Sequence, residues 1–321
     1  MNRRSLTLLG AALALAPLLG QAQSFPEKPI TFVVPFAAGT ATDQIARALG
    51  NVITAETKQA VVIDNRAGAS GFIASQFVAK APADGYTVLI TTNTTHAANE
   101  HLYKKLPYDP VKDFAPLAGL GKGGQIMVVN PASNVKSVAD FIALAKKEPG
   151  KLSFGSGSSS SRMAGELLQQ MADIKLLHVP YKSNTLAVTD LLGGQIDMMI
   201  TDTATGLPQV KGGKLRALGM SSASRSPLAP DVPTIAEAGV KGYEMGYWFA
   251  AYAPAKTPPA VVKRLNELLV KAAKSDSAKT AFYERSGTEV FTTSPEELAK
   301  FQAGESQKWG RIVKAAGIEA E

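Results

Sequence analysis

The alternation of short apolar runs with helical patterns restricts the fold of this chain more than any other feature. Buried strands are predicted at residues 30–34, 60–63, 87–91, 125–129, 151–154, 177–179, 197–200 and 216–220. Amphipathic helical patterns lie between many of these strands, and two longer ones follow at 258–273 and 294–316. Strands that alternate with helices form parallel sheets with right-handed crossovers. We therefore expect an α/β protein, and 321 residues suffice for two domains.

Two distant stretches share one local pattern. "FVVPFAAGTATDQIARAL" (32–49) and "KLSFGSGSSSSRMAGELLQQM" (151–171) each contain a strand, a turn of small residues and a helix. The first N–H groups of a helix lack partners and carry the positive end of its dipole, so such turns can bind anions. Ordinary capping is the alternative, because Thr40 and Asp43 match a capping box. The presence of two such turns favours a shared anion site.

The first 22 residues have the composition of a signal peptide. Arg3 and Arg4 precede an uncharged apolar run over 6–19, and Gly20, Gln21 and Ala22 supply small residues at the cleavage spacing. The run is too short to span a bilayer, and no later run is longer. We expect export by the Sec or the twin-arginine route. The chain has no cysteine, so the exported protein must depend on its core and not on disulfides.

The basic residues do not indicate a nucleic-acid partner. The net charge is +7, and removal of the two arginines of the signal segment leaves +5. Lysine and arginine are scattered and not grouped with aromatic residues, as they are in nucleic-acid-binding proteins. A mild positive field favours small anionic ligands instead.

The motifs that would indicate an enzyme are weak. Gly119, Gly121 and Gly124 match the letters of a dinucleotide fingerprint, but a strand follows them and not a helix. We interpret this segment as a flexible crossover. The three histidines show no zinc-ligand spacing, and no Gly-x-Ser-x-Gly elbow is present. A serine hydrolase would need His178 beside a loop serine. We expect no catalysis, no metal and no cofactor.

Several motifs then carry a family resemblance. They include "VVPFAAGTATD", "NRAGASG", "PADGYTVLITT", "KLPYDPVKDFAPLAGL", "HVPYK", "DLLGGQID", "KGGKLRALGMSSASRSPLAPDVPTIAEAG" and "KWGRIVKAAGI". In this order and spacing, the chain resembles the Bug family, the periplasmic substrate-binding proteins of tripartite tricarboxylate transporters. The resemblance covers essentially all of the chain after the signal segment.

The resemblance implies a two-domain periplasmic-binding-protein (Venus flytrap) fold. Domain 1 would comprise residues 25–124 and 248–321, and domain 2 residues 125–247. Two hinge crossings, at 125–131 and 247–254, would join them. The family's function implies a monomeric periplasmic protein that binds a small carboxylate, here a dicarboxylate or an aromatic acid. It would deliver this ligand to the membrane subunits of the transporter.

The candidate ligand contacts lie on the two turns and at the ends of neighbouring strands. We expect one carboxylate on the first turn, a second turn that closes on it, and aromatic walls from Phe36, Trp248 and Phe249. The candidates are Phe36, Ala38, Gly39, Thr40, Ala41, Thr42, Asp43, Thr92, Gly155, Ser156, Gly157, Ser158, Ser159, Ser160, Tyr181, Lys182, Asp202, Thr203 and Trp248. Lys182 could pair a second carboxylate. Asp202 would repel one, so we expect it to hydrogen-bond a loop or a donor group of the ligand.

Three departures from the family pattern fall on these contacts. Thr40 stands where a second glycine is usual, residues 158–163 replace a segment with asparagine and prolines, and Ser183-Asn184 replaces Gly-Gly. They leave the fold prediction unchanged and the ligand unidentified. Two other functions stay open: a periplasmic serine hydrolase, and a sensor that presents its closed form to a receptor.

Overall fold

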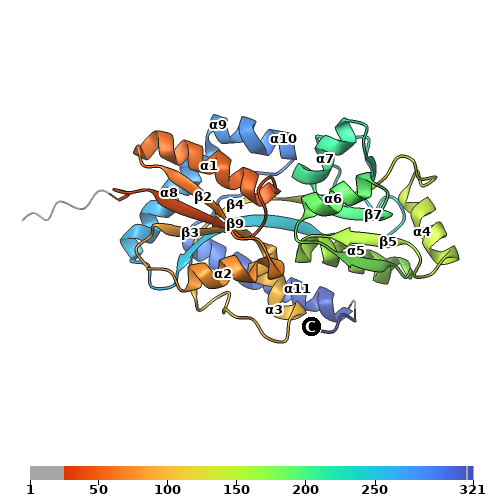
Figure 1. Cartoon of the computed structure of the whole chain (residues 1–321), viewed down its shortest axis with the longest axis horizontal. Coiled ribbons are helices and arrows are strands. Elements are labelled where there is room, and N and C mark those ends of the chain that lie inside the picture. The colour runs from red at the N-terminus through yellow and green to blue at the C-terminus, as the bar shows by residue number, and fades with distance from the viewer. Residues whose placement is uncertain (1–24, 316, 321) are drawn as a thin grey trace, which may run out of the picture.

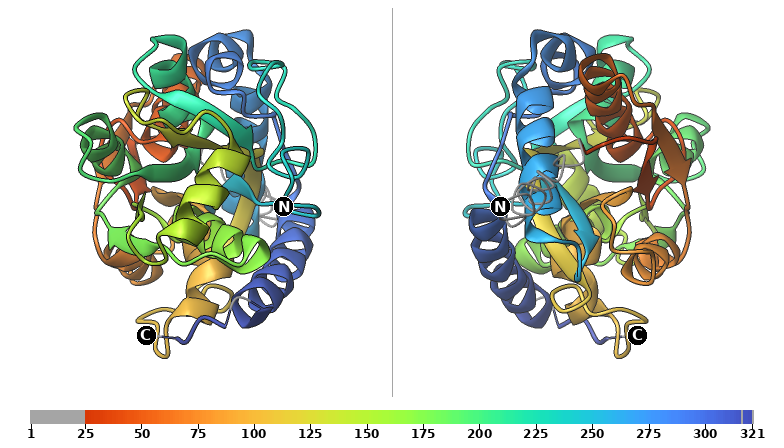
Figure 2. Two further views of the ribbon diagram at one scale, coloured as in Figure 1. Left: turned by 90° about the vertical axis from the view of Figure 1, so that its right-hand side faces the viewer. Right: turned by 90° about the vertical axis from the view of Figure 1, so that its left-hand side faces the viewer.

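The computed structural model describes residues 25–315 and 317–320. The predicted signal peptide, 1–22, lies outside these residues. Two lobes lie end to end along the long axis, and strands β4 and β9 run near their boundary (Figure 1). Views along that axis show helices on both sides of the sheet, with α11 along one side (Figure 2). Among the described residues, no helix has the length and apolar character needed to cross a membrane.

Lobe 1 is named here for the part built around strands β2, β1, β3 and β9 and the first part of β4. Its strands are β1 (Ile30–Val34), β2 (Val61–Asn65), β3 (Thr87–Thr92) and β9 (Gly246–Pro254), and its helices are α1 (Ala41–Thr57), η1 (Ala69–Gly71), α2 (Phe72–Ala79), η2 (Thr94–Ala98), α3 (Asn99–Leu102), α8 (Pro259–Lys274), α9 (Asp276–Ala278), η3 (Lys279–Tyr283), α10 (Glu284–Ser286) and α11 (Pro295–Ala315). Strand β1 pairs in parallel with β2 and β3, whereas β9 is antiparallel to β3.

Lobe 2 is the remaining α/β unit. Its strands are β5 (Ser153–Ser156), β6 (Leu177–Pro180), β7 (Met198–Asp202) and β8 (Arg216–Met220), and its helices are α4 (Val138–Lys147), α5 (Ser159–Ala172), α6 (Asn184–Leu192) and α7 (Thr203–Lys211). Strand β5 pairs in parallel with β6 and β7. The sheet order over both lobes is β2-β1-β3-β9-β4-β7-β5-β6, with β8 also paired to β4.

Strand β4 (Phe114–Val129) belongs to both lobes. Residues 114–124 pair antiparallel with β9, whereas residues 125–129 pair with β7 and β8. The pairing partner therefore changes between Gly124 and Gln125. The chain returns to lobe 1 where Met245 gives way to Gly246 at the start of β9. Residues 247–254, which the resemblance assigned to a crossing, form nearly the whole of β9.

The interpretation of the glycine run in β4 as a flexible crossover is wrong. It is a paired strand, and its glycines permit close packing. A Cβ on Gly119 would lie 2.9 Å from the carbonyl oxygen of Phe291, and one on Gly121 would lie 2.8 Å from the Thr288 side chain. The chain around Thr288–Phe291 thus packs directly on the backbone of β4.

All eight predicted strands are present, with ends that differ by a few residues. The two long helical patterns near the C-terminus form α8 and α11, as predicted. Leu298 and Trp309 of α11 and Leu265 and Leu269 of α8 are almost completely buried. These apolar helix faces pack against the sheet and stabilise lobe 1.

Candidate functional site

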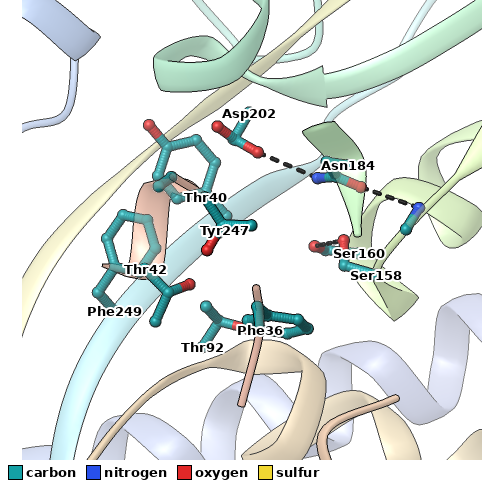
Figure 3. A pocket seen from close by; sticks show the side chains of 12 residues that line it. Phe36, Thr40, Thr42, Thr92, Ser158, Ser160, Asn184, Asp202, Tyr247 and Phe249 are labelled. Atoms are coloured by element: carbon teal, nitrogen blue, oxygen red, sulfur yellow. Dashed lines mark hydrogen bonds between the residues drawn. The ribbon is translucent and has the colours of Figure 1, made fainter. Parts of the chain in front are cut away.

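A cavity lies between the two lobes. Its lining comes from the end of β1, the N-termini of α1, α5 and α6, the ends of β3 and β7, and β9 (Figure 3). The lining residues are Phe36, Thr40, Ala41, Thr42, Thr92, Gly157, Ser158, Ser160, Asn184, Asp202, Tyr247 and Phe249. The two turns that the sequence pattern singled out therefore face one common space.

The N-terminus of α1 leaves its first amides available to a ligand. Thr40 precedes the helix, but its hydroxyl donates to the carbonyl oxygen of Ala37 at 2.8 Å and accepts no helix N–H. The predicted capping box is therefore wrong. Within the described residues, the N–H groups of Ala41, Thr42 and Asp43 donate to no protein acceptor. Ala41 and Thr42 line the cavity, so their amides and the Thr42 hydroxyl can meet an anion there, whereas the N–H and hydroxyl of Thr40 both donate to Ala37.

Asp43 stabilises the turn before α1 from the side that faces away from the cavity. Its carboxylate accepts hydrogen bonds from the N–H of Gly39 at 2.9 Å and from Asn65 Nδ2 at 3.0 Å, and it pairs with Arg47 at 2.9 Å. Burial raises the pKa of Asp43, but the hydrogen bonds from Arg47, Gly39 and Asn65 together lower that pKa below its usual 3.8. The ionised carboxylate therefore stabilises the turn without lining the cavity.

The N-terminus of α5 faces α1 across the cavity. Ser158 is its N-cap and accepts from the N–H of Ser161 at 3.2 Å. The hydroxyls of Ser158 and Ser160 lie 3.1 Å apart, and both residues line the cavity (Figure 3). Ser159 lies between them but points elsewhere, because its hydroxyl donates to Asn99 Oδ1 in lobe 1 at 2.8 Å.

Asn184 and Asp202 form a hydrogen-bonded pair at the lobe 2 end of the cavity. Asn184 Oδ1 accepts from the N–H of Gly157 at 2.9 Å, and its Nδ2 donates to Asp202 Oδ2 at 3.0 Å (Figure 3). The other Asp202 oxygen accepts from the N–H of Thr205 at 2.8 Å and caps α7. Asp202 thus bonds the first turns of helices α6 and α7 and not a loop, and a hydrogen bond from a donor group of the ligand stays a prediction. Asp202 is the one charged side chain among the lining residues, so amides and hydroxyls must supply the attraction for an anion.

Tyr247 lines the cavity but was not among the expected contacts, whereas Phe249 was expected as an aromatic wall and Asn184 as a departure from the family pattern at a ligand contact. Successive side chains of a strand point to opposite faces. Trp248 lies between Tyr247 and Phe249 on β9, and it contacts Phe301 and Glu305 of α11. The structure therefore places Trp248 in the core beside α11, and its two neighbours face the cavity. The alternation of a strand places Tyr247 and Phe249 on one face, but the packing of α11 on Trp248 decides which face meets the cavity.

Nine further candidates lie outside the lining, each for a local reason. Ala38 and Gly39 are exposed on the outside of the first turn, and Asp43 lies behind it. Tyr181 donates to Asp190, Lys182 is exposed, and the Thr203 hydroxyl bonds the Tyr247 hydroxyl at 3.0 Å. Gly155 is buried against Ile196, and Ser159 is bonded to Asn99. The ninth is Ser156.

Ser156 meets the histidine that a serine hydrolase would need. Its hydroxyl lies 2.7 Å from Nε2 of His178 on the neighbouring strand β6. However, Ser156 is 4% exposed and does not line the cavity. A nucleophile must reach the reacting carbon of a substrate. The pair therefore has the contact of a nucleophile and its base but lies outside the space that a substrate could occupy.

Comparison with known proteins identifies the family to which this chain belongs. The family model described as "Tripartite tricarboxylate transporter family receptor" matches residues 45–318. The chain belongs to this family. Its members include the periplasmic binding protein BugD, which is similar to this chain with 31% identity and a TM-score of 0.88 over 92% of this chain and 100% of the BugD chain. The predicted Bug family and two-lobed fold are confirmed.

Two other solved Bug-family structures contain ligands. The Rhodopseudomonas palustris protein Rpa4515, solved with adipate, is 36% identical with a TM-score of 0.90 over 92% of this chain and all of its own. MatC from Rhodopseudomonas palustris, solved with malate, is 30% identical with a TM-score of 0.85 over 90% of this chain and all of its own. Both ligands are small dicarboxylates. This chain is thus a solute-binding protein of a family in which small carboxylates are bound.

Proposed function

We propose that this Bug-family protein captures a small carboxylate in the cavity between its lobes and delivers it to a tripartite tricarboxylate transporter. One observation carries the proposal: two helix N-termini, those of α1 and α5, face the same cavity. Amides from α1 and hydroxyls from both helices can then hold one carboxylate from two sides. The aromatic rings of Phe36, Tyr247 and Phe249 suit the apolar part of a short dicarboxylate or an aromatic acid.

The basic and apolar signal segment and the family membership support a location in the periplasm. We also propose that a monomer is the working unit. Delivery distinguishes the protein from a sensor. Uptake of the carboxylate by cells that carry the membrane subunits should require this protein, whereas a sensor would leave uptake unchanged.

A thermal-shift panel tests the binding. Mono-, di- and tricarboxylates, amino acids, aromatic acids and sugars are added to the mature protein at up to millimolar concentration. A ligand at 100 times its Kd stabilises the folded state by about 2.7 kcal/mol, so adipate, malate or an aromatic acid should raise the melting temperature. A rise with sugars alone, and none with any carboxylate, would contradict the proposal.

We also propose that the protein is not a hydrolase, because Ser156 lies outside the cavity. A serine-reactive phosphonate should leave Ser156 unlabelled, and generic esters should not be turned over above the rate of a Ser156→Ala variant. Mass spectrometry after incubation checks the labelling. Stoichiometric modification of Ser156, lost in a His178→Gln variant, would instead establish the pair as a catalytic centre.

A further inference from the structure

We infer that Asn99 and Ser159 form a latch that positions the N-terminus of α5 against lobe 1 and so sets the affinity for every carboxylate alike. This inference rests on the proposed function but concerns residues outside the cavity. Ser159 Oγ donates to Asn99 Oδ1 at 2.8 Å, and this bond joins the start of α5 in lobe 2 to the start of α3 in lobe 1. Both residues are buried, at 4% and 0% exposure.

Asn99 is held in place by its own lobe. Its Nδ2 donates to the carbonyl oxygen of Ser70 at 3.0 Å and to the hydroxyl of Tyr108 at 3.2 Å. The Tyr108 hydroxyl in turn donates to the carbonyl oxygen of Thr95 at 2.9 Å. These contacts fix the amide so that Oδ1 faces lobe 2, where Ser159 is its donor. The acceptor is therefore in position before the lobes meet.

Ser159 lies in the first turn of α5, between the two cavity-lining serines Ser158 and Ser160. Any contact that fixes Ser159 also fixes the hydroxyls on either side of it. When the lobes separate, water can satisfy both Asn99 and Ser159, so the net contribution of the bond is modest. A typical net hydrogen bond changes an equilibrium by about two- to tenfold. The latch should shift the ratio of closed to open lobes by that factor.

This role has a signature that a ligand contact lacks. If only the closed form binds and it is the minor form without ligand, the apparent Kd is the intrinsic Kd divided by the closed fraction. Loss of the latch then raises the Kd by one common factor for all carboxylates. Loss of a hydroxyl that touches the ligand raises the Kd by factors that depend on the shape of each ligand.

The experiment compares Ser159→Ala with wild type by calorimetry and stopped-flow kinetics, using adipate, malate and succinate as probes. We expect all three Kd values to rise by the same factor, about two- to tenfold, with a faster release of each. Tyr252→Phe is the matched control, because it removes a buried hydrogen bond within lobe 1, to Gln302 Oε1 at 3.1 Å, that does not involve Asn99, and it should leave the Kd values unchanged. Asn99→Ala and the double variant Asn99→Ala/Ser159→Ala complete a double-mutant cycle. The effects of the two substitutions on the Kd should not be additive, because each removes the same hydrogen bond.

A second measurement does not depend on ligand. The chain has no cysteine, so spin labels can be placed at the exposed positions Lys104 and Lys147 through Lys→Cys changes. The interlobe distance distribution without ligand should shift to longer values in Ser159→Ala. If none of the probes binds wild type, the proposed function fails, while this distance still tests the latch. Unchanged distances, or Kd factors that differ widely among the three probes, would overturn the latch.

Discussion

Replacement of Gly157 by alanine is expected to weaken carboxylate binding by about 100-fold. A Cβ at this position would lie 1.9 Å from the carbonyl carbon of Ser183 and 2.2 Å from the backbone nitrogen of Asn184. These are backbone atoms at the start of α6, so the turn before α5 must move. The movement would break the bond from the Gly157 N–H to Asn184 and displace Ser158 from the cavity.

Overpacking of this kind costs about 3 kcal/mol, and a similar loss in binding corresponds to about a 100-fold higher Kd. Urea unfolding and calorimetry with the best carboxylate of the panel measure the two effects. Gly304→Ala is the matched control: this glycine lies in α11 with no atom within 4 Å of an added Cβ. It should be stabilised by up to about 1 kcal/mol with unchanged Kd. Normal binding by Gly157→Ala would show that the turn does not hold the ligand.

The second large effect is expected from Asp43→Ala, which should lower both stability and affinity. The substitution leaves the N–H of Gly39 and the amide of Asn65 without their acceptor and removes the partner of Arg47. Because the Asp43 side chain is only 3% exposed, the cost should be about 2–3 kcal/mol in the free energy of unfolding. Glu289→Ala is the control, since its ion pair with Lys122 is exposed and should contribute less than about 1 kcal/mol.

The pH dependence of stability tests whether the charge of Asp43 stabilises the turn, and the comparison is between wild type and Asp43→Asn. The pKa of Asp43 in the folded protein is below its usual 3.8, so folding favours the ionised form. The resulting stability is fully present above the unfolded pKa near 4 and is lost as the pH falls through the lower folded pKa. The difference in unfolding free energy between wild type and Asp43→Asn should therefore shrink between about pH 5 and pH 3. A difference that does not change over this range would mean that Asp43 does not stabilise the turn through its charge.

The eight predicted strands and the two turns that line the cavity could be predicted because they depend on local patterns. The first part of β4 and all of β9 could not, because they are buried strands without apolar–polar alternation. The glycines of β4 are explained only by the chain that packs on them, from Thr288 to Phe291. Such long-range contacts leave no periodic signal in the strand itself.

The sequence predicts which two turns form the site, but it does not predict which side chains of those turns face the cavity. Successive residues of a helix differ in direction by about 100°, so three adjacent serines cannot all face one cavity. Ser158 and Ser160 face it, and Ser159 faces lobe 1. On β9, side chains alternate between the two faces of the strand, so Trp248 points away from the cavity when Tyr247 and Phe249 point into it. Both choices depend on what the other lobe or α11 places opposite, which the local sequence does not contain.

Gly39, a candidate ligand contact, lies on the exposed outer side of the first turn. An added Cβ at this position meets no atom within 4 Å. The φ of Gly39 is +82°, a left-handed backbone conformation in which any other residue would be strained. A substitution at Gly39 therefore tests the conformation of the turn, not access to the cavity.

The central claim, that the first turns of α1 and α5 hold the carboxylate, is tested most directly by amide NMR during a titration. Protein labelled with ¹⁵N is titrated with the best carboxylate of the panel, and the amide proton shifts are followed. The N–H groups of Ala41 and Thr42 should show the largest downfield changes, because they gain a charged acceptor, and those of Ser159 and Ser160 should follow. If these amides stay in place at saturation while the largest changes occur elsewhere, the ligand is bound at another site and the account is wrong.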